Sequence, residues 1–369
     1  MTKLPRLYKQ TKTGKTQICD ISFDGPKYYV SFGQLNGKLQ TNITECKPKN
    51  IGKSNETTAE QQAELEALAD HKKKTKSGYS TSLDAPSEVT LPAKVKVYQD
   101  NLKNIKFPAY STFKLNGVNG LFKRENSKLT LYSRGGEIYP DIPHLIKPIS
   151  DLMDHLNCNE LNGELYIHGQ HLQDIQSAVK KPNHLSNRLG FYIFDIPDIQ
   201  SEYAVRNQVI LKDMANTLTL LGSPIRLHIR FLIGEECYSH EDIELKFNAA
   251  IQSGYEGTVI YNANHVYKYN ERSSDAFKYK KALDAEFQII DYELDKQGNP
   301  TLICQSEGGP FKVRPTGTAE YRKQLLVDLP NHIGKFYKVE YETLSKDKIP
   351  LKPIGVGIRD CDLQGNPVI

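Results

Sequence analysis

The chain has 369 residues, a formal charge of +4, 38% hydrophobic residues and 25% charged residues, proportions typical of a folded protein with two or three domains. No apolar run approaches the roughly 20 residues that span a bilayer, and the N-terminus lacks the apolar core of a secretory signal. Six scattered cysteines without a C-x-x-C pair argue against a zinc module or a disulfide framework and favour a reducing compartment.

The first part of the chain, residues 1–79, is predicted to be a small β-rich unit closed by a helix. Asn36-Gly37 between two strand-like runs indicates a hairpin. Thr58, with Gln61 three residues later, has the spacing of a capping box at the start of a helix. We expect this helix to end near Gly78.

The end of the predicted helix is strongly basic. Its lysines suit the negative end of the helix dipole and are candidate contacts for DNA phosphates, with a solvated helix end as the alternative interpretation. The four residues are Lys72, Lys73, Lys74 and Lys76.

The middle of the chain is predicted to be an α+β domain. Residues 80–94, rich in Ser, Thr and Pro, are expected to be a linker, and residues 95–283 alternate short strands with turns and helices. Strands are expected over 129–132, 163–167, 191–194 and 258–261, and helices over 202–221 and 242–253.

The last part, residues 284–369, is predicted to be a small barrel of the OB type, because five short strands surround one helix. The strands are expected over 286–292, 301–305, 311–314, 336–342 and 354–359, and the helix over 319–327.

Short polar motifs follow one another along the α+β part. Each one alone could be a surface turn or a core strand, and only their order is informative. They are Lys114-Leu115-Asn116-Gly117, Ser133-Arg134-Gly135-Gly136 after a strand, Asn162-Gly163-Glu164-Leu165 with Glu164 at a strand start, the aromatic strand Phe191-Tyr192-Ile193-Phe194-Asp195, Glu256 at another strand start, and Lys278-Tyr279-Lys280 with both lysines on one strand face.

This series resembles the covalent nucleotidyltransferase superfamily of ATP-dependent DNA ligases, RNA ligases and mRNA capping enzymes. The segment Ile349–Pro353, followed by Gly357–Asp360, is similar to the last motif as phage and bacterial DNA ligases write it. The N-terminal unit resembles a WGR-type DNA-binding module, with Phe32-Gly33-Gln34 in place of Trp-Gly-Arg. The resemblance implies an α+β adenylation domain followed by an OB-fold barrel, with a small WGR-like β/α domain in front.

The resemblance also implies a role for each motif. Lys114 would form a covalent bond to AMP, and Glu164 and Glu256 would hold Mg²⁺. Lys352 and Arg359 in the barrel would orient the pyrophosphate of ATP. The implied ATP- and AMP-binding residues are Phe113, Lys114, Gly117, Arg134, Glu164, Phe194, Lys278 and Lys280.

Physical chemistry supports a lysine nucleophile only if its amine can lose a proton. A free lysine has a pKa of about 10.4, and we expect neighbouring cations such as Lys278 and Lys280, and a bound metal ion, to lower that value. The same two lysines can neutralise charge that develops on the α-phosphate. Gly117 is expected to let the chain turn sharply beside the nucleotide.

Three positions depart from the family pattern. Asn116 stands where Asp is usual, and Asn119 where Arg is usual, so either the activity is weaker or Lys123 or Arg124 supplies the missing charge. Thr112 stands where ligases often have a Glu or Gln that reads the adenine amino group.

Together these observations predict an ATP-dependent DNA ligase that seals nicks in duplex DNA with ATP and Mg²⁺, in replication, repair or recombination. We expect a monomer that binds nicked duplex DNA and no membrane, in the cytoplasm, either as a phage protein in its host cell or as an intracellular bacterial protein. The alternatives are an RNA ligase of the same superfamily and a catalytically weak DNA-binding relative. His168 and His171 are expected to be polar surface residues and not metal ligands.

Overall fold

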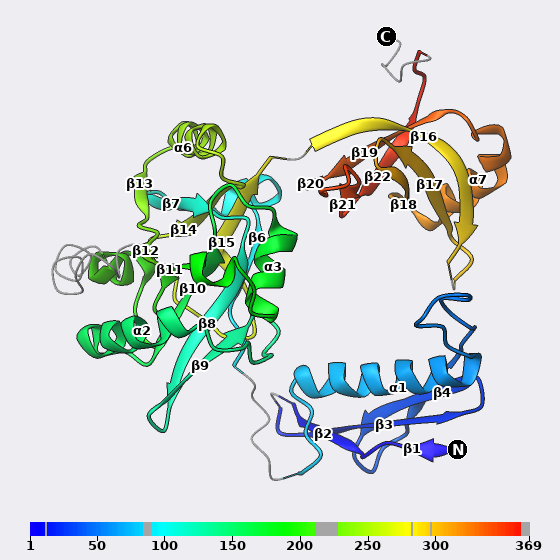
Figure 1. Cartoon of the computed structure of the whole chain (residues 1–369), viewed down its shortest axis with the longest axis horizontal. Coiled ribbons are helices and arrows are strands. Elements are labelled where there is room, and N and C mark those ends of the chain that lie inside the picture. Colours follow the sequence, from blue (N-terminus) through cyan, green and yellow to red (C-terminus); the bar gives the residue numbers. More distant parts are fainter. Residues whose placement is uncertain (12, 84–89, 211–227, 282, 296, 363–369) are drawn as a thin grey trace.

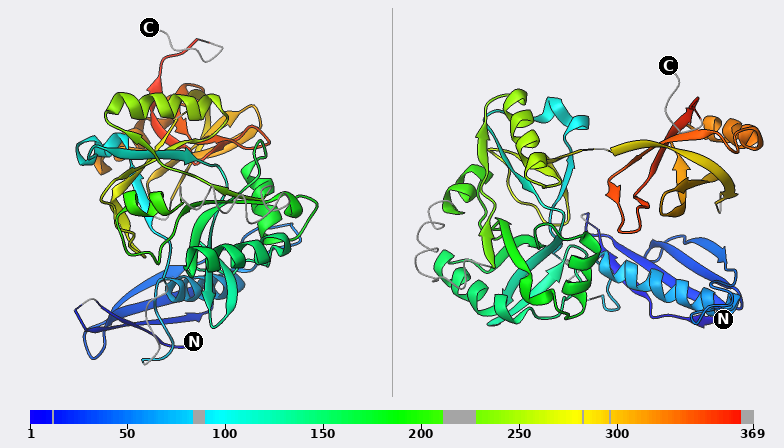
Figure 2. Two further views of the ribbon diagram at one scale, coloured as in Figure 1. Left: turned by 90° about the vertical axis from the view of Figure 1, so that its left-hand side faces the viewer. Right: turned by 45° about the horizontal axis from the view of Figure 1, so that its top comes forward.

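The computed structural model describes residues 1–11, 13–83, 90–210, 228–281, 283–295 and 297–362. Within these residues the strands gather in three parts of the chain: an N-terminal sheet, two sheets in the middle, and a closed barrel near the C-terminus (Figure 1). The barrel and the N-terminal sheet lie on the same side of the middle part in Figure 1 and in the right-hand view of Figure 2.

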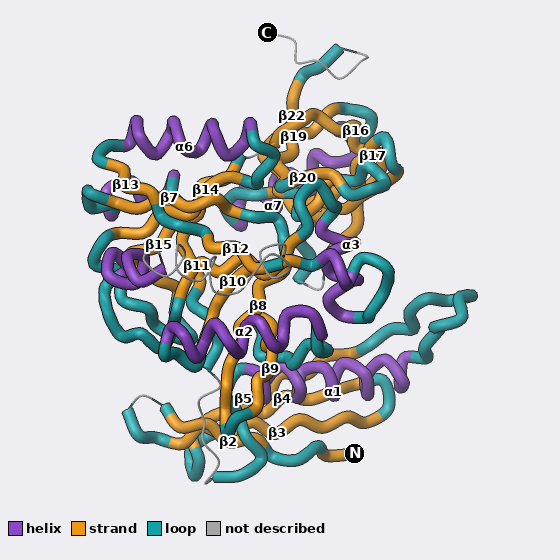
Figure 3. Tube along the Cα trace, turned by 60° about the vertical axis from the view of Figure 1, so that its left-hand side comes forward, coloured by secondary structure: helices purple, strands orange, loops and turns teal. Residues whose placement is uncertain are grey.

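The N-terminal part is an antiparallel sheet covered by one helix. Its strands run in the order β1-β3-β4-β5, with β2 paired to β3. Figure 3 shows the helix α1 lying along β3 and β4, and Leu7, Cys19, Ile21 and Ala67 form the core between them. The elements are β1 Thr2–Lys3, β2 Leu7–Gln10, β3 Thr16–Asp24, β4 Lys27–Gln34, β5 Gln40–Glu45 and α1 Ala59–Lys76.

Both ends of α1 follow from the sequence. Thr58 and Gln61 make the reciprocal hydrogen bonds of a capping box, as predicted. The C-cap is Ser77, and Gly78 directly after it has a φ of +89°, which glycine adopts without strain. The expected hairpin is present as well, with Asn36 at a φ of +63° between β4 and β5. The likeness to a WGR module stays a prediction.

The middle part consists of two five-stranded sheets, ordered β12-β11-β10-β8-β9 and β13-β7-β14-β15-β6. α3 packs on β8 and β10, and α6 packs on β7 and β14. The strands are β6 Lys94–Val97, β7 Ala109–Lys114, β8 Val118–Glu125, β9 Lys128–Ser133, β10 Glu160–Tyr166, β11 Gly190–Asp195, β12 Ile229–Phe231, β13 Glu235–Cys237, β14 Gly257–Asn262 and β15 Arg272–Lys280. The helices are α2 Pro143–Leu156, α3 Leu172–Lys180 and α6 His240–Gln252, with short 3₁₀ turns at Gln99–Asn104 and Ser186–Arg188.

Two expectations for this part need correction. Glu164 does not stand at a strand start, because β10 already begins at Glu160. The helix expected over 202–221 is present over 203–210, and the remainder of that prediction lies outside the described residues. The helices α2 and α3 were not predicted.

The C-terminal part is a closed barrel in the strand order β16-β17-β18-β22-β19. This confirms the expected α+β fold with a small barrel. β15 ends at Lys280 and β16 begins at Leu283. Leu283 pairs with Tyr341 in the neighbouring strand β19. The elements are β16 Leu283–Leu294, β17 Pro300–Ser306, β18 Gly309–Pro315, α7 Ala319–Asp328, a 3₁₀ turn at Leu329–Asn331, β19 Phe336–Tyr341, β20 Thr343–Leu344, β21 Pro350–Leu351 and β22 Ile354–Arg359.

Helices of the described residues are too short or too polar to cross a membrane.

Candidate active site

A cavity of about 560 Å³ is lined by strands from both central sheets and by two barrel residues, Glu342 and Lys352. Its size suits a nucleotide. The structure brings nearly all of the residues predicted to bind nucleotide, metal or pyrophosphate to this cavity, and of these only Arg359 does not line it. Those that do are Phe113, Lys114, Gly117, Arg134, Glu164, Phe194, Glu256, Lys278, Lys280 and Lys352.

Lys114 and Glu256 are held together by strand register. Lys114 ends β7 opposite Gly257 of β14, so the preceding residue, Glu256, stands beside the lysine. Lys114 Nζ donates to Glu256 Oε2 at 2.5 Å. Gly257 has a φ of +149°, and a Cβ there would lie 2.1 Å from the Tyr279 carbonyl oxygen. A glycine is therefore required to bring the carboxylate to the amine.

Glu164 lies on the cavity wall in the middle of β10. Burial is the main cause that raises the pKa of Glu164 to about 7; the charges of Lys114 and Arg134 oppose the rise, and the neighbouring Glu256 adds to it. A Cβ on Gly117 would lie 2.5 Å from the Leu165 carbonyl oxygen and 2.8 Å from Glu164 Cγ. Gly117 therefore permits close packing against β10, and the expected sharp turn is not its reason, since its φ is not positive.

Lys278 and Lys280 project from one face of β15 into the cavity, as the alternation of strand residues requires. Burial lowers the pKa of Lys278, and the charges of Lys280 and Lys114 lower it further. Lys280 Nζ lies 3.8 Å from Glu256 Oε1 and also pairs with Glu342 of the barrel. The cavity thus holds several cations at close range, with carboxylates between them.

Arg134 and Phe194 reach the cavity from two other strands. Arg134 follows β9 in a turn where Ser133 Oγ accepts from the backbone N–H groups of Gly135 and Glu137. Phe194 is half-buried on β11 and free to present a ring face to a bound base. Phe113 is more exposed and stacks on Tyr255, with ring centroids 4.6 Å apart.

One of the three departures from the family pattern, Asn119, has a local explanation. Asn119 is buried, and its Nδ2 donates to Asn162 Oδ1 at 3.0 Å and to the Gly163 carbonyl oxygen at 3.3 Å. It therefore fastens β8 to β10 and offers the cavity no cation. Asn116 and the buried Thr112 both line the cavity.

Lys123 and Arg124 do not replace the missing charge. Lys123 pairs with Glu125 and Glu160 at 2.9 Å and 3.4 Å. Arg124 donates to Asp154 Oδ1 at 2.5 Å. Neither residue lines the cavity, so of the two alternatives the one in which Lys123 or Arg124 supplies the charge does not hold.

The basic end of α1 is partly engaged within the protein. Lys72 and Lys76 pair with Glu137 of the middle part. Lys74 lies over the rings of Phe32 and Tyr79, at 5.7 Å and 5.4 Å from their centroids. Lys73 is exposed. Of the four lysines, Lys73 is therefore the best placed to meet a phosphate.

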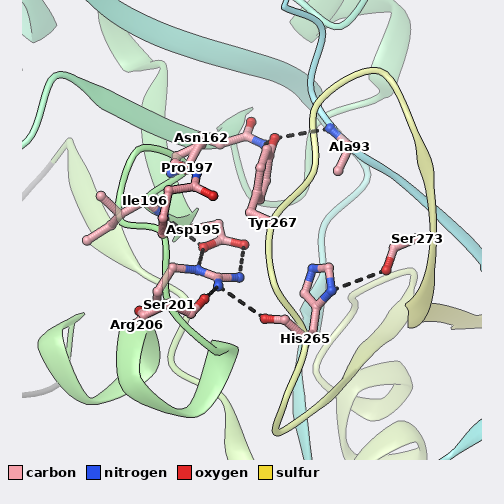
Figure 4. Close-up of polar contacts among 11 residues, drawn as sticks. Ala93, Asn162, Asp195, Ile196, Pro197, Ser201, Arg206, His265, Tyr267 and Ser273 are labelled. Atoms are coloured by element: carbon pink, nitrogen blue, oxygen red, sulfur yellow. Dashed lines mark hydrogen bonds and ion pairs between the residues drawn. The ribbon is translucent and has the colours of Figure 1, made fainter. Parts of the chain in front are cut away.

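A buried ion pair beneath the cavity was missed by sequence reasoning (Figure 4). Arg206 is fully buried and donates twice to Asp195, Nε to Oδ1 at 2.6 Å and Nη2 to Oδ2 at 3.0 Å. Its third nitrogen, Nη1, donates to the carbonyl oxygens of Ser201 and His265. Asp195 directly follows Phe194, so this pair fixes the end of β11 that carries the expected base-stacking ring. Asp195 is the last residue of the aromatic strand motif that begins at Phe191, but nothing in the neighbouring sequence indicates that it pairs with Arg206.

The described residues contain no group of three His, Cys, Asp or Glu side chains that could hold a metal ion. A divalent ion would therefore depend on phosphate oxygens as well as protein ligands, which is how Mg²⁺ usually binds. The two carboxylates predicted to hold it, Glu164 and Glu256, line the cavity and fit that mode. His168 and His171 are exposed, as expected.

Comparisons with known proteins agree with this geometry. The DNA ligases of two African swine fever virus isolates, Warthog/Namibia/Wart80/1980 and Tick/South Africa/Pretoriuskop Pr4/1996, are each 28% identical over 364 residues, covering 90% of this chain and 83% of the viral proteins. A solved structure from a study of Lig E DNA ligases superposes with a TM-score of 0.57 at 19% identity, covering 74% of this chain and all of that one. A structure named Pmar-Lig_Pre gives 0.62 at 17% identity, covering 74% of this chain and 68% of that one. At these identities the two structures support the fold.

The family assignment comes from the sequence of the middle part. Residues 90–280 match the family model described as the ATP dependent DNA ligase domain. The match spans more than half of the chain and contains the Lys114–Glu256 pair, Glu164 and the two lysines of β15. The chain therefore belongs to the family of ATP-dependent DNA ligases.

Proposed function

We propose that this ligase seals nicks in duplex DNA through an AMP group carried on Lys114. The observation that carries the proposal is the Lys114–Glu256 pair, at 2.5 Å, inside a cavity of nucleotide size that also holds Lys278, Lys280, Arg134 and Lys352. A positioned carboxylate beside an amine is the usual arrangement for activating a nucleophile.

In the first step the Lys114 ammonium gives a proton to Glu256 and its nitrogen attacks the α-phosphorus of ATP. The new N–P bond forms as the bond from that phosphorus to the β-phosphate oxygen breaks, and pyrophosphate leaves. Lys278 and Lys280 stabilise the charge that develops on the phosphate. Phe194 stacks on the adenine, and Glu164 accepts a hydrogen bond from a ribose hydroxyl.

In the second step the AMP passes from Lys114 to the 5′-phosphate of the nick, and in the third the 3′-hydroxyl attacks that phosphate and releases AMP. Arg134 holds the 5′-phosphate through charge-assisted hydrogen bonds. Glu164 and Glu256 would hold Mg²⁺ together with the phosphates, and when bound the ion would neutralise phosphate charge. Nick recognition relies on backbone phosphates, since a nick carries no sequence message.

The test is adduct formation with ATP labelled on the α-phosphate. The wild-type protein should become labelled in the presence of Mg²⁺, and Lys114→Ala should not. Lys114→Arg should fail as well, because a guanidinium keeps its proton in this pH range. Label that maps to a different lysine would refute the assignment.

Substrate choice needs a separate assay. Nicked duplexes with an all-DNA 3′ strand and with a 3′-terminal RNA strand should be compared with single-stranded RNA ends. We expect the DNA nick to be sealed fastest. Faster joining of RNA ends would make the protein an RNA ligase.

A further inference from the structure

Glu342 lies between two lysines that the proposed function assigns to the phosphates of ATP. Its carboxylate pairs with Lys280 of β15 and, at 2.5 Å through its other oxygen, with Lys352 of the barrel. All three side chains line the cavity. No motif of the sequence pointed to Glu342, which directly follows the last residue of β19.

This placement is fixed by strand register. Lys280 is the last residue of β15, and β16 begins at Leu283, which pairs with Tyr341. Glu342 therefore emerges beside the start of β16, next to Lys280. On its other side the Glu342 backbone N–H donates to the Leu351 carbonyl oxygen at 3.1 Å, which brings in Lys352.

The two lysines on either side of Glu342 are cations of the kind that bind phosphate. Burial raises the pKa of Glu342, but hydrogen bonds from Lys280 and Lys352 outweigh that effect and the pKa is lowered overall. The carboxylate is therefore ionised near neutral pH and occupies the cations that a polyphosphate needs.

We propose that Glu342 is an internal competitor of the nucleotide's phosphates. Its carboxylate holds Lys280 and Lys352 until the phosphates of ATP displace it, and it returns to them when pyrophosphate leaves. This inference rests on the proposed function and adds a residue that sets the affinity of the site for polyphosphates.

The informative variant is Glu342→Gln, which keeps the shape of the side chain and removes its charge. The KM for ATP in adduct formation and the inhibition constant of pyrophosphate should both fall, by about two- to fivefold, the effect expected when a partly exposed ion pair no longer has to be broken. Both should fall by a similar factor because both ligands use the same two lysines. The kcat of adduct formation should change less than the KM.

Two further variants serve as controls in the full-length protein. Glu342→Asp keeps the charge and should remain closer to the wild type than Glu342→Gln. Glu340→Gln removes an exposed carboxylate from the same strand and should leave both constants unchanged. Thermal melting of each variant shows whether it is folded.

Titration calorimetry with pyrophosphate alone tests the inference without any catalysis. Tighter pyrophosphate binding by Glu342→Gln would support it even if the wild type formed no adduct, in which case the proposed function would be the part that fails. Equal or weaker binding of pyrophosphate by a folded Glu342→Gln protein would overturn the inference. An unchanged or higher KM for ATP would overturn it as well.

Discussion

Replacing Glu164 by glutamine should change the pH dependence of stability in a defined direction. Burial raises the pKa of this carboxyl from an ordinary 4.5 to about 7 in the folded protein. Between these values the unfolded chain releases the proton and the folded protein keeps it. The wild type therefore loses stability as the pH rises from about 5 to about 7, because the unfolded state binds fewer protons. Glutamine does not titrate in this pH range, so the stability of Glu164→Gln should not fall in this way as the pH rises.

The magnitude follows from the two pKa values. At about 1.4 kcal/mol for each tenfold change in proton affinity, the gap between 4.5 and about 7 amounts to at most about 3.5 kcal/mol. We expect about 2–3 kcal/mol, because Glu164 is partly reached by solvent and water screens its charge.

The assay is chemical denaturation of the wild type and Glu164→Gln at pH 5, 6, 7 and 8 without ATP, since a bound nucleotide would add its own stabilisation. The variant should gain stability relative to the wild type as the pH rises, while Glu340→Gln should show no such trend. A difference between wild type and Glu164→Gln that stays constant from pH 5 to pH 8 would refute the reasoning.

Three further outcomes are expected. Glu256→Ala should form the lysyl-AMP adduct about a hundred to a thousand times more slowly, the usual effect of losing one preorganised charge contact. Added Mg²⁺ should restore the rate poorly. A near-normal rate would show that Glu256 has no part in the mechanism. Asp195→Asn should destabilise the protein by about 3–5 kcal/mol in denaturant melts, because it leaves Arg206 buried without a countercharge, and an unchanged midpoint would contradict that role. A chain beginning at Ser80 should bind nicked duplex more weakly, and the slope of log affinity against log salt should flatten by about 0.9 for each lost phosphate contact. Equal affinity and slope would show that the N-terminal unit does not hold DNA.

Sequence reasoning was most successful where a local pattern determines the structure. The capping box at Thr58 depends on residues only three positions apart, and the barrel strands depend on short alternating runs bounded by turns. The helix α2 was not predicted, and it contains Pro148 within its length, a residue that ordinarily argues against a helix interior.

In the candidate site, too, local sequence patterns identified some residues and missed others. The ordered motifs led to the residues that line the cavity, because each motif sits at or near a strand end. Glu342 was missed because strand register brings it to Lys280, 62 residues away along the chain. Arg206 was missed because it lies on a helix, and no short motif shows that this helix turns it back onto Asp195 at the end of β11. Lys123 and Arg124 were misjudged because proximity to Lys114 along the chain does not reveal which way a side chain points.

The end of β15 and the start of β16 lie beside the cavity, because Lys280 at this junction lines it. Glu342 sits beside this junction, whereas Arg359 pairs with Phe336, which in turn faces Gln288 further along β16. At about 3.3 Å per strand residue, Gln288 lies about 16 Å along β16 from Leu283, and Arg359 is at that level of the barrel, two strands away. The barrel therefore contributes Glu342 and Lys352 to the cavity while the same strand register holds Arg359 apart from it.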